Sequence, residues 1–100
     1  MENNMFTIEL KKPIMYNDKE YKTLSFDFET LTGNDGMAIE EELGQLGKAV
    51  LVPALSGEYL VRMAARACTQ KVGSDIFALL SIREYNQIRT AARSFLLLSE

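Results

Sequence analysis

Apolar residues recur at every second position in the first third of this 100-residue chain and at every third or fourth position afterwards. Residues 5–10 and 21–28 alternate apolar with polar side chains, which is the period of a half-buried strand. Asn17 and Asp18 lie between these segments, and both residue types tolerate the positive φ angles of a tight turn. The pattern therefore predicts a β-hairpin over about residues 5–29. Its apolar face has to meet helices or a second subunit, because a lone hairpin is barely stable.

Pro13 lies inside the first alternating segment and has no backbone N–H to donate. It is therefore expected either to break the first strand or to place it at a sheet edge.

Capping residues predict where helices begin in the rest of the chain. Thr32 and Asp35 form an Asp variant of the capping box before a helix that extends to about residue 46. The glycines at the start of this segment are equally compatible with a tight turn over residues 33–36. Ser56 is expected to cap a second helix over residues 57–70.

Ser74 is expected to cap a short helical turn over residues 75–80. Ser81 and Glu84 then form a capping box that opens a last helix over residues 82–97. These segments predict an α+β protein with an N-terminal β-hairpin followed by a small bundle of three to four helices. The expected organisation is one domain, residues 1–100, with a helical part over 32–98.

The periodicity also predicts which side chains face the core. These positions are Phe6, Ile8, Leu10, Leu24, Phe26, Phe28, Met37, Ile39, Leu43, Leu46, Tyr59, Leu60, Met63, Ala64, Ala67, Cys68, Ile76, Phe77, Leu79, Leu80, Tyr85, Ile88, Ala92 and Phe95.

The residue inventory argues against catalysis. The chain contains no histidine and one cysteine, Cys68, so an intramolecular disulfide is excluded and a zinc site or a histidine-activated nucleophile is not expected. No glycine pattern matches a phosphate-binding loop. The three consecutive glutamates at 40–42 point about 100° apart on a helix and do not converge on a metal. We therefore expect no enzyme activity, no catalytic residues, no metal and no cofactor, and we expect Cys68 to be a core residue.

Charge is distributed unevenly along the sequence. Residues 1–49 contain five basic and ten acidic side chains, a balance of −5, and residues 50–100 contain six basic and four acidic, a balance of +2. An acidic first half and an arginine-rich second half suit association between copies. Possible intersubunit ion pairs involve Arg62, Arg66, Arg89 and Arg93, although solvated helix faces explain the same pattern. The net charge of −3 argues against nucleic-acid binding.

Two segments are too apolar to be exposed without a partner. One is the connector over residues 49–55, with Val50, Leu51, Val52 and Leu55, which is expected to lie beneath helices or in an interface. The other is the end of the last helix, Phe95, Leu96, Leu97 and Leu98, which has to be covered by the hairpin, a second copy or another protein. No apolar run has the roughly 18 residues of a membrane span, so no membrane partner and a cytoplasmic location are expected.

The order of several short motifs resembles the tail assembly chaperones of long-tailed bacteriophages and their prophages. An I-x-L-x-x-P strand is followed by Leu31-Thr32-Gly33-x-Asp35, then by Leu51-Val52-Pro53, then by Glu58-Tyr59-Leu60 leading to Ala64-Ala65-Arg66-Ala67, and last by a capped helix ending in Phe95-Leu96. The resemblance extends over about residues 6–98. Gly36 stands where an aliphatic residue is expected, and Thr69-Gln70-Lys71 replaces a small turn segment.

This resemblance implies a non-catalytic role in phage tail assembly. Such proteins coat the tape-measure protein and keep it soluble before the tail tube polymerises, act as oligomers in the bacterial cytoplasm, and are absent from the mature virion. Many also exist in a longer, frameshifted form. The resemblance implies that either the connector or the Phe95–Leu98 end contacts the tape-measure protein while the other serves self-association. The alternatives are a permanent structural component of the tail or connector, and a small regulatory or nucleic-acid-binding protein that uses its arginines.

Overall fold

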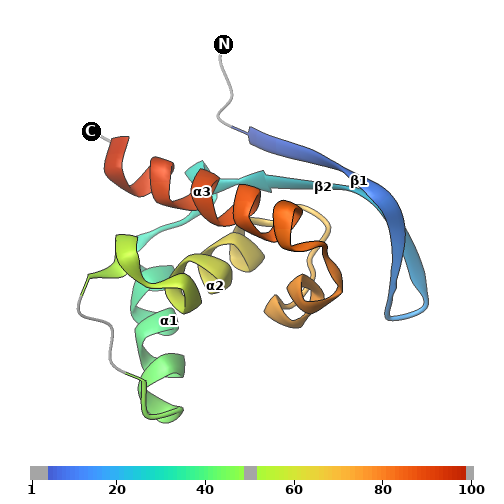
Figure 1. The fold of residues 1–100 in the computed structure, drawn as a ribbon. Coiled ribbons are helices and arrows are strands. Elements are labelled where there is room, and N and C mark those ends of the chain that lie inside the picture. Colours follow the sequence, from blue (N-terminus) through green and yellow to red (C-terminus); the bar gives the residue numbers. More distant parts are fainter. Residues whose placement is uncertain (1–4, 49–51, 99–100) are drawn as a thin grey trace.

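The computed structural model describes residues 5–48 and 52–98, with the side chain of Leu98 outside that description. It is an α+β protein in which a two-stranded antiparallel sheet lies against helices, as the sequence predicts (Figure 1). The elements in chain order are β1 (Met5–Tyr16), β2 (Lys19–Asp27), η1 (Phe28–Thr30), α1 (Gly33–Gln45), η2 (Pro53–Leu55), α2 (Gly57–Ala67), η3 (Ser74–Leu79) and α3 (Ile82–Leu98).

The hairpin turn is built from two residues in the left-handed region. Asn17 and Asp18 have φ angles of 52° and 65°, and Tyr16 pairs with Lys19 across the turn. Two successive positive φ angles match the twist of the flanking strands, which explains why Asn and Asp occupy these positions. The predicted turn is confirmed.

Pro13 lies where the ladder between the strands is irregular. Pairing is regular from Met5 to Glu9 and resumes at Ile14, with a register shift between Glu9 and Ile14. Pro13 has no N–H to donate, so the ladder of hydrogen bonds is interrupted here, although the strand itself continues. Beyond this shift the hairpin curves toward η3 (Figure 1). There the Tyr16 hydroxyl donates to Asp75 Oδ1 at 2.6 Å and accepts the Gly73 N–H at 3.2 Å.

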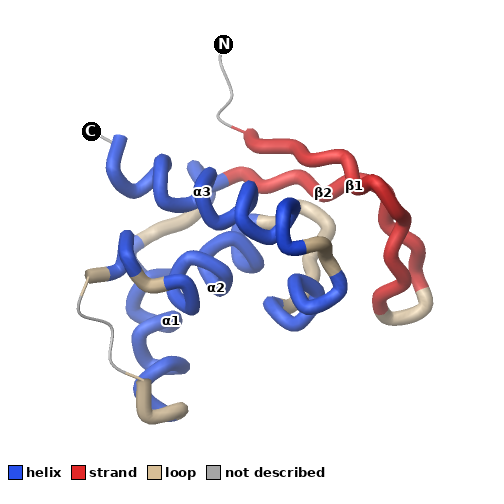
Figure 2. The backbone as a smooth tube through the Cα atoms, in the orientation of Figure 1, coloured by secondary structure: helices blue, strands red, loops and turns tan. Residues whose placement is uncertain are grey.

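The outer edge of β2 is covered by the residues that follow α2. The Thr69 N–H donates to the Ser25 carbonyl at 2.8 Å, and the Ser25 N–H donates to Gln70 Oε1 at 3.1 Å. Cys68 forms an isolated antiparallel bridge with Phe26. Figure 2 shows this loop running beside β2. The second helix therefore ends at Ala67, three residues before the predicted end, because its continuation pairs with the sheet.

The core lies between the apolar face of the hairpin and the three helices. The buried apolar residues are Ile8, Leu10, Leu24, Phe26, Phe28, Ile39, Leu43, Tyr59, Leu60, Met63, Ala64, Ala67, Cys68, Val72, Ile76, Phe77, Ile88 and Ala92. Helix α2 contacts both α1 and α3. Its small residue Ala64 is fully buried, which allows close approach of the neighbouring elements.

Three predicted core positions are wrong. Met37 is 68% exposed, Leu46 56% and Leu79 49%. Helix α1 buries only the face marked by Ile39 and Leu43, and Met37 precedes Ile39 by two residues, about 200° around the helix. Leu46 is the C-cap residue after the last residue of α1, so it no longer follows the helical face that Ile39 and Leu43 bury.

The caps agree with the sequence at three of four helices. The Thr32 N–H donates to Asp35 Oδ2 at 2.8 Å, Ser56 Oγ accepts the Tyr59 N–H at 3.1 Å, and Ser81 and Glu84 bond reciprocally before α3. The alternative of a tight turn over residues 33–36 is therefore wrong, since α1 begins at Gly33. The expected Ser74 cap is also wrong, because η3 is a 3₁₀ segment that follows Gly73 without a side-chain cap.

Candidate functional site

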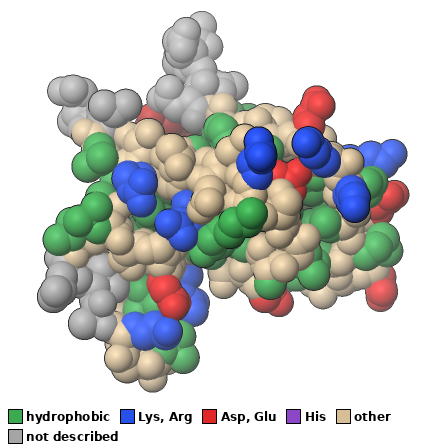
Figure 3. Space-filling model, in the orientation of Figure 1, with side chains coloured by type: hydrophobic (Ala, Val, Ile, Leu, Met, Phe, Trp, Pro, Cys, Tyr) green, Lys and Arg blue, Asp and Glu red, His purple; other side chains and the backbone are tan. Residues whose placement is uncertain are grey.

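Three large apolar side chains are exposed at one end of the molecule. Leu55 is 74% exposed, Leu97 65% and Val52 50%. Leu55 and Val52 belong to η2 and its N-cap, and Leu97 lies in the last turn of α3. On the face drawn in Figure 3, hydrophobic side chains lie along the edge where Figure 1 places η2 and the end of α3. We call Val52, Leu55 and Leu97 the apolar end.

A hydrogen bond holds the two halves of the apolar end together. Arg93 Nε donates to the backbone carbonyl of Ala54 at 2.9 Å, which attaches η2 to α3. Leu97 follows Arg93 by one helical turn and lies on the same side of α3. The described part of the connector and the end of α3, which the sequence treats as two surfaces, are therefore neighbours in the fold. The described part of the connector is not buried beneath helices, and Val50 and Leu51 lie outside the described residues.

The predicted apolar helix end divides into inner and outer side chains. Phe95 stacks on Phe28, the first residue of η1, with ring centroids 5.5 Å apart. Leu96 is half-buried and lines a small cavity of about 180 Å³ together with Ile39 and Met63. Leu97 points away from this core, and the side chain of Leu98 is outside the described set. Phe95 is thus covered by η1, the segment that directly follows the hairpin.

Two of the four predicted interface arginines have carboxylate partners within the chain. Arg62 Nη1 lies 3.1 Å from Glu42 Oε1, and Arg66 Nε lies 2.8 Å from Asp35 Oδ1. Arg66 also approaches Glu42 at 3.7 Å. These contacts join α2 to α1. The hydrogen bond from the Thr32 backbone and that from Arg66 lower the pKa of Asp35, because both favour its charged form.

The other two arginines have no carboxylate partner among residues 5–48 and 52–98. The Arg89 guanidinium lies over the Tyr85 ring, 5.2 Å from its centroid, and its Nε is buried without a hydrogen-bond acceptor in the described part of the chain. A methyl group at Gly57 would lie 3.2 Å from Arg89 Nη1, which places this cation against the first turn of α2. Glu58, in that same turn, bonds to Lys48 at 3.0 Å.

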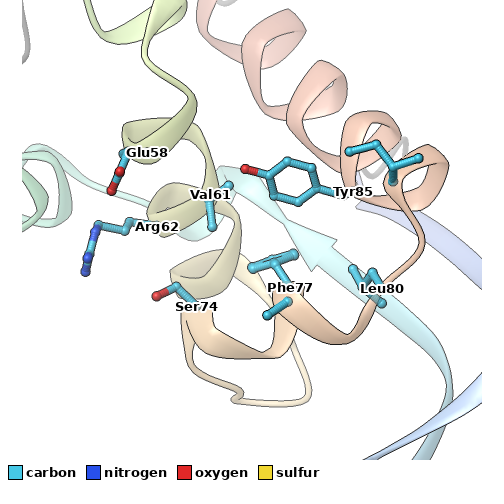
Figure 4. Close-up of a pocket in the computed structure, with 9 residues that line it drawn as sticks. Glu58, Val61, Arg62, Ser74, Phe77, Leu80 and Tyr85 are labelled. Atoms are coloured by element: carbon cyan, nitrogen blue, oxygen red, sulfur yellow. The ribbon is translucent and has the colours of Figure 1, made fainter.

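A second feature is a hollow between α2, η3 and α3, with a volume of about 500 Å³ (Figure 4). Val61, Phe77 and Leu80 form its apolar wall, and the Tyr85 ring extends across it from α3. The charged residues at its rim, Glu58 and Arg62, bind Lys48 and Glu42. The apolar wall of this hollow suits an apolar side chain of a partner.

A third hollow lies between the first residues of β1 and the outer side of α3. Its volume is about 980 Å³, and Phe6 and Ile8 line it on one side, with Ile82, Arg83 and Gln87 on the other. Its walls mix apolar, amide and charged groups. This composition is typical of an open surface groove.

Within the described ranges no three Cys, Asp or Glu side chains are arranged to hold a metal ion. Glu42 of the 40–42 run binds arginines of α2. Cys68 is buried, and burial raises the pKa of its thiol, so the thiolate is disfavoured. A membrane-crossing helix, long and apolar over its whole length, is not found in the part of the chain that the structure describes.

Comparison of the chain with models of protein families, with curated proteins and with solved structures found no match. A function has to be inferred from the residues of this chain. The sequence places Arg89 and Arg93 one turn apart on the outer side of the last helix, but sequence reasoning missed that Leu97 continues the same face. Their spacing of four residues is the signal that would have shown it.

Proposed function

We propose that this protein is a tail assembly chaperone of a long-tailed bacteriophage or prophage, which binds the tape-measure protein and keeps it soluble before the tail tube polymerises. It acts without catalysis and as an oligomer, in the cytoplasm of the bacterial host. The observation that most directly supports a binding role is the apolar end, where Leu55 and Leu97 are exposed on two elements joined by the Arg93–Ala54 hydrogen bond.

The physical reason is that a long amphipathic helix exposes an apolar stripe that aggregates unless a partner covers it. Exposed leucines on a rigid platform cover such a stripe by the helix-in-groove mode of recognition. One copy of this chain offers only a small surface. Several copies along one tape-measure chain, held together by self-association, increase the overall affinity through effective concentration.

The experiment is co-expression with the tape-measure protein of the same phage genome, followed by affinity purification. We expect a soluble complex with the wild-type chain and an insoluble tape measure when the chain is omitted. The double variant Leu55→Asp, Leu97→Asp should fail to recover the tape measure. Ile82→Asp is the matched control, because Ile82 is 71% exposed at the opposite end of α3.

Two results would contradict parts of this proposal. If the wild-type chain leaves the tape measure insoluble, alone and together with a longer frameshifted form, the chaperone function is wrong. If the apolar-end variant still captures the tape measure and the Ile82 variant does not, the contact lies at the hollows near Ile82 instead.

The alternative function is a permanent structural component of the tail or connector. The two functions differ in where the protein is found after assembly. Mass spectrometry of purified virions should detect a structural component at stoichiometric amounts. The chaperone should be absent from them.

A further inference from the structure

We infer that the apolar end selects a partner helix that has carboxylates beside its apolar stripe, through Arg89 and Arg93. The inference rests on the proposed function for the identity of the natural partner, and it adds the chemistry that the partner has to present. The structure supports it through the position of the two arginines and through the absence of carboxylate partners for them among the described residues.

The first step is geometric. Arg89, Arg93 and Leu97 follow one another at intervals of four residues on α3, so they form one stripe that ends at the apolar end. The Arg93–Ala54 bond fixes this stripe beside η2 at 2.9 Å. A helix that covers Leu97 and runs along this stripe of α3 passes next to both guanidinium groups.

The second step is electrostatic. Arg62 and Arg66 are neutralised by carboxylates of α1, whereas Arg89 and Arg93 have none among the described residues. Arg93 uses Nε for Ala54, which leaves its two terminal nitrogens as donors. Arg89 stacks on Tyr85 beside the first turn of α2, where the N-terminus carries a partial positive charge and the carboxylate of that turn, Glu58, bonds to Lys48. A carboxylate from a partner would supply the missing negative charge at both positions.

The third step concerns specificity. Apolar contact alone does not distinguish one amphipathic helix from another, whereas an uncompensated pair of cations favours acidic flanks and repels basic ones. Guanidinium groups also bind carboxylates in a two-point geometry that lysine does not reproduce. The arginine pair therefore sets the charge pattern and the orientation of the bound helix.

The test uses two synthetic helical peptides with the same leucine stripe, one flanked by glutamates and one by lysines. Fluorescence anisotropy with the full chain should show the glutamate peptide binding roughly ten-fold tighter, from two ion pairs of ordinary surface strength. The preference should shrink with added salt and disappear in the Arg89→Gln, Arg93→Gln variant. Arg83→Gln, on the first turn of α3, is the matched control and should keep it.

The double variant Arg89→Lys, Arg93→Lys keeps both positive charges but not the two-point geometry of the guanidinium groups, so it should retain part of the preference for the glutamate peptide. Equal binding of the two peptides, no binding of the glutamate peptide, or an unchanged preference in the double glutamine variant would overturn the inference. Circular dichroism checks that each variant is folded. The peptide experiment does not use the tape-measure protein. If the proposed function is wrong, this shows in the co-expression experiment instead, where the wild-type chain fails to capture the tape measure.

Discussion

The carboxylate of Glu84 accepts the backbone N–H of Lys11 at 2.9 Å, across 73 residues of sequence. The same carboxylate accepts the Ser81 N–H through its other oxygen at 3.3 Å. One side chain therefore caps α3 and holds β1 where its ladder is irregular. Among the described residues, Glu84 is the charged side chain that is buried. Removing its carboxylate would leave two backbone N–H groups without their acceptor, which lowers the free energy of unfolding.

Replacing Glu84 by Gln should lower the free energy of unfolding by about 1–2 kcal/mol. The side-chain NH₂ group of Gln would then face one of the two backbone N–H donors, those of Lys11 and Ser81, which would lose its acceptor. Urea denaturation at neutral pH measures this loss. Glu41→Gln, on an exposed face of α1, should change the free energy of unfolding by no more than about 0.5 kcal/mol. Equal effects of the two substitutions would contradict the assigned role of Glu84.

The stability of the wild-type protein should fall in acid. Hydrogen bonds from Lys11 and Ser81 lower the pKa of Glu84 below its usual value of 4.5, and those from Thr32 and Arg66 lower that of Asp35 below 3.8. The unfolded chain therefore binds protons more readily than the folded one. The stabilisation that these two carboxylates give the folded state is complete above the pKa values of the unfolded chain, and it is lost as pH falls through the lowered pKa values of the folded state. Urea titrations over this range should show a shallower decline for Glu84→Gln than for Glu41→Gln.

Local signals were enough to predict the hairpin, its turn and the start of α3, since Asn17, Asp18 and the Ser81–Glu84 pair act over a few residues. The end of α2 was not predictable in the same way. Residues after Ala67 leave the helix because Thr69 and Gln70 bond to Ser25, a partner distant in sequence. Likewise, the exposure of Met37 depends on which face of α1 meets α2, and helical periodicity alone does not decide that.

The candidate site was predicted in part. Apolar excess indicated both Leu55 and Leu97, but no sequence pattern pairs Arg93 with the carbonyl of Ala54. The four arginines looked equivalent by composition. The structure divides them, because only Arg62 and Arg66 face the acidic side of α1.

The hairpin turn offers a test of backbone strain. Asp18 has a φ angle of 65°, where a β-branched residue is strongly disfavoured and glycine is not. Asp18→Val should lower the free energy of unfolding by about 1–2 kcal/mol, while Asp18→Gly should be neutral or stabilising by a few tenths. Thermal denaturation of the two variants compares them directly. A valine variant as stable as the glycine variant would contradict this turn.

Substituting a leucine of the core and a leucine of the apolar end should distinguish loss of stability from loss of binding. Leu60 is fully buried, so Leu60→Ala should cost about 2–5 kcal/mol and unfold much of the protein. Leu97→Ala should change the free energy of unfolding by less than about 0.5 kcal/mol and still weaken partner capture. A large loss of stability at Leu97 would show that it belongs to the core instead.

Cys68 should react with alkylating reagents only after unfolding. Its thiol is buried and its pKa is raised by that burial, so both access and thiolate formation are unfavourable. Mass spectrometry after iodoacetamide treatment should show an unmodified chain in buffer and a fully modified chain in urea. Rapid modification in buffer would contradict the burial of this residue.

The bond from Thr69 to the Ser25 carbonyl, together with the strand register, shows which amide protons of β1 point away from β2. Because the backbone groups of Ser25 face that loop, the backbones of Ser25 and its partner Thr7 do not bond to each other, although their hydroxyl groups lie 3.2 Å apart. Thr7 and Glu9 therefore direct their N–H groups away from β2. Ile8 and Leu24 then form the hydrogen-bonded pair. Deuterium should therefore enter this strand at alternate positions, rapidly at Thr7 and Glu9 and slowly at Ile8, so a single strand should record two very different exchange rates.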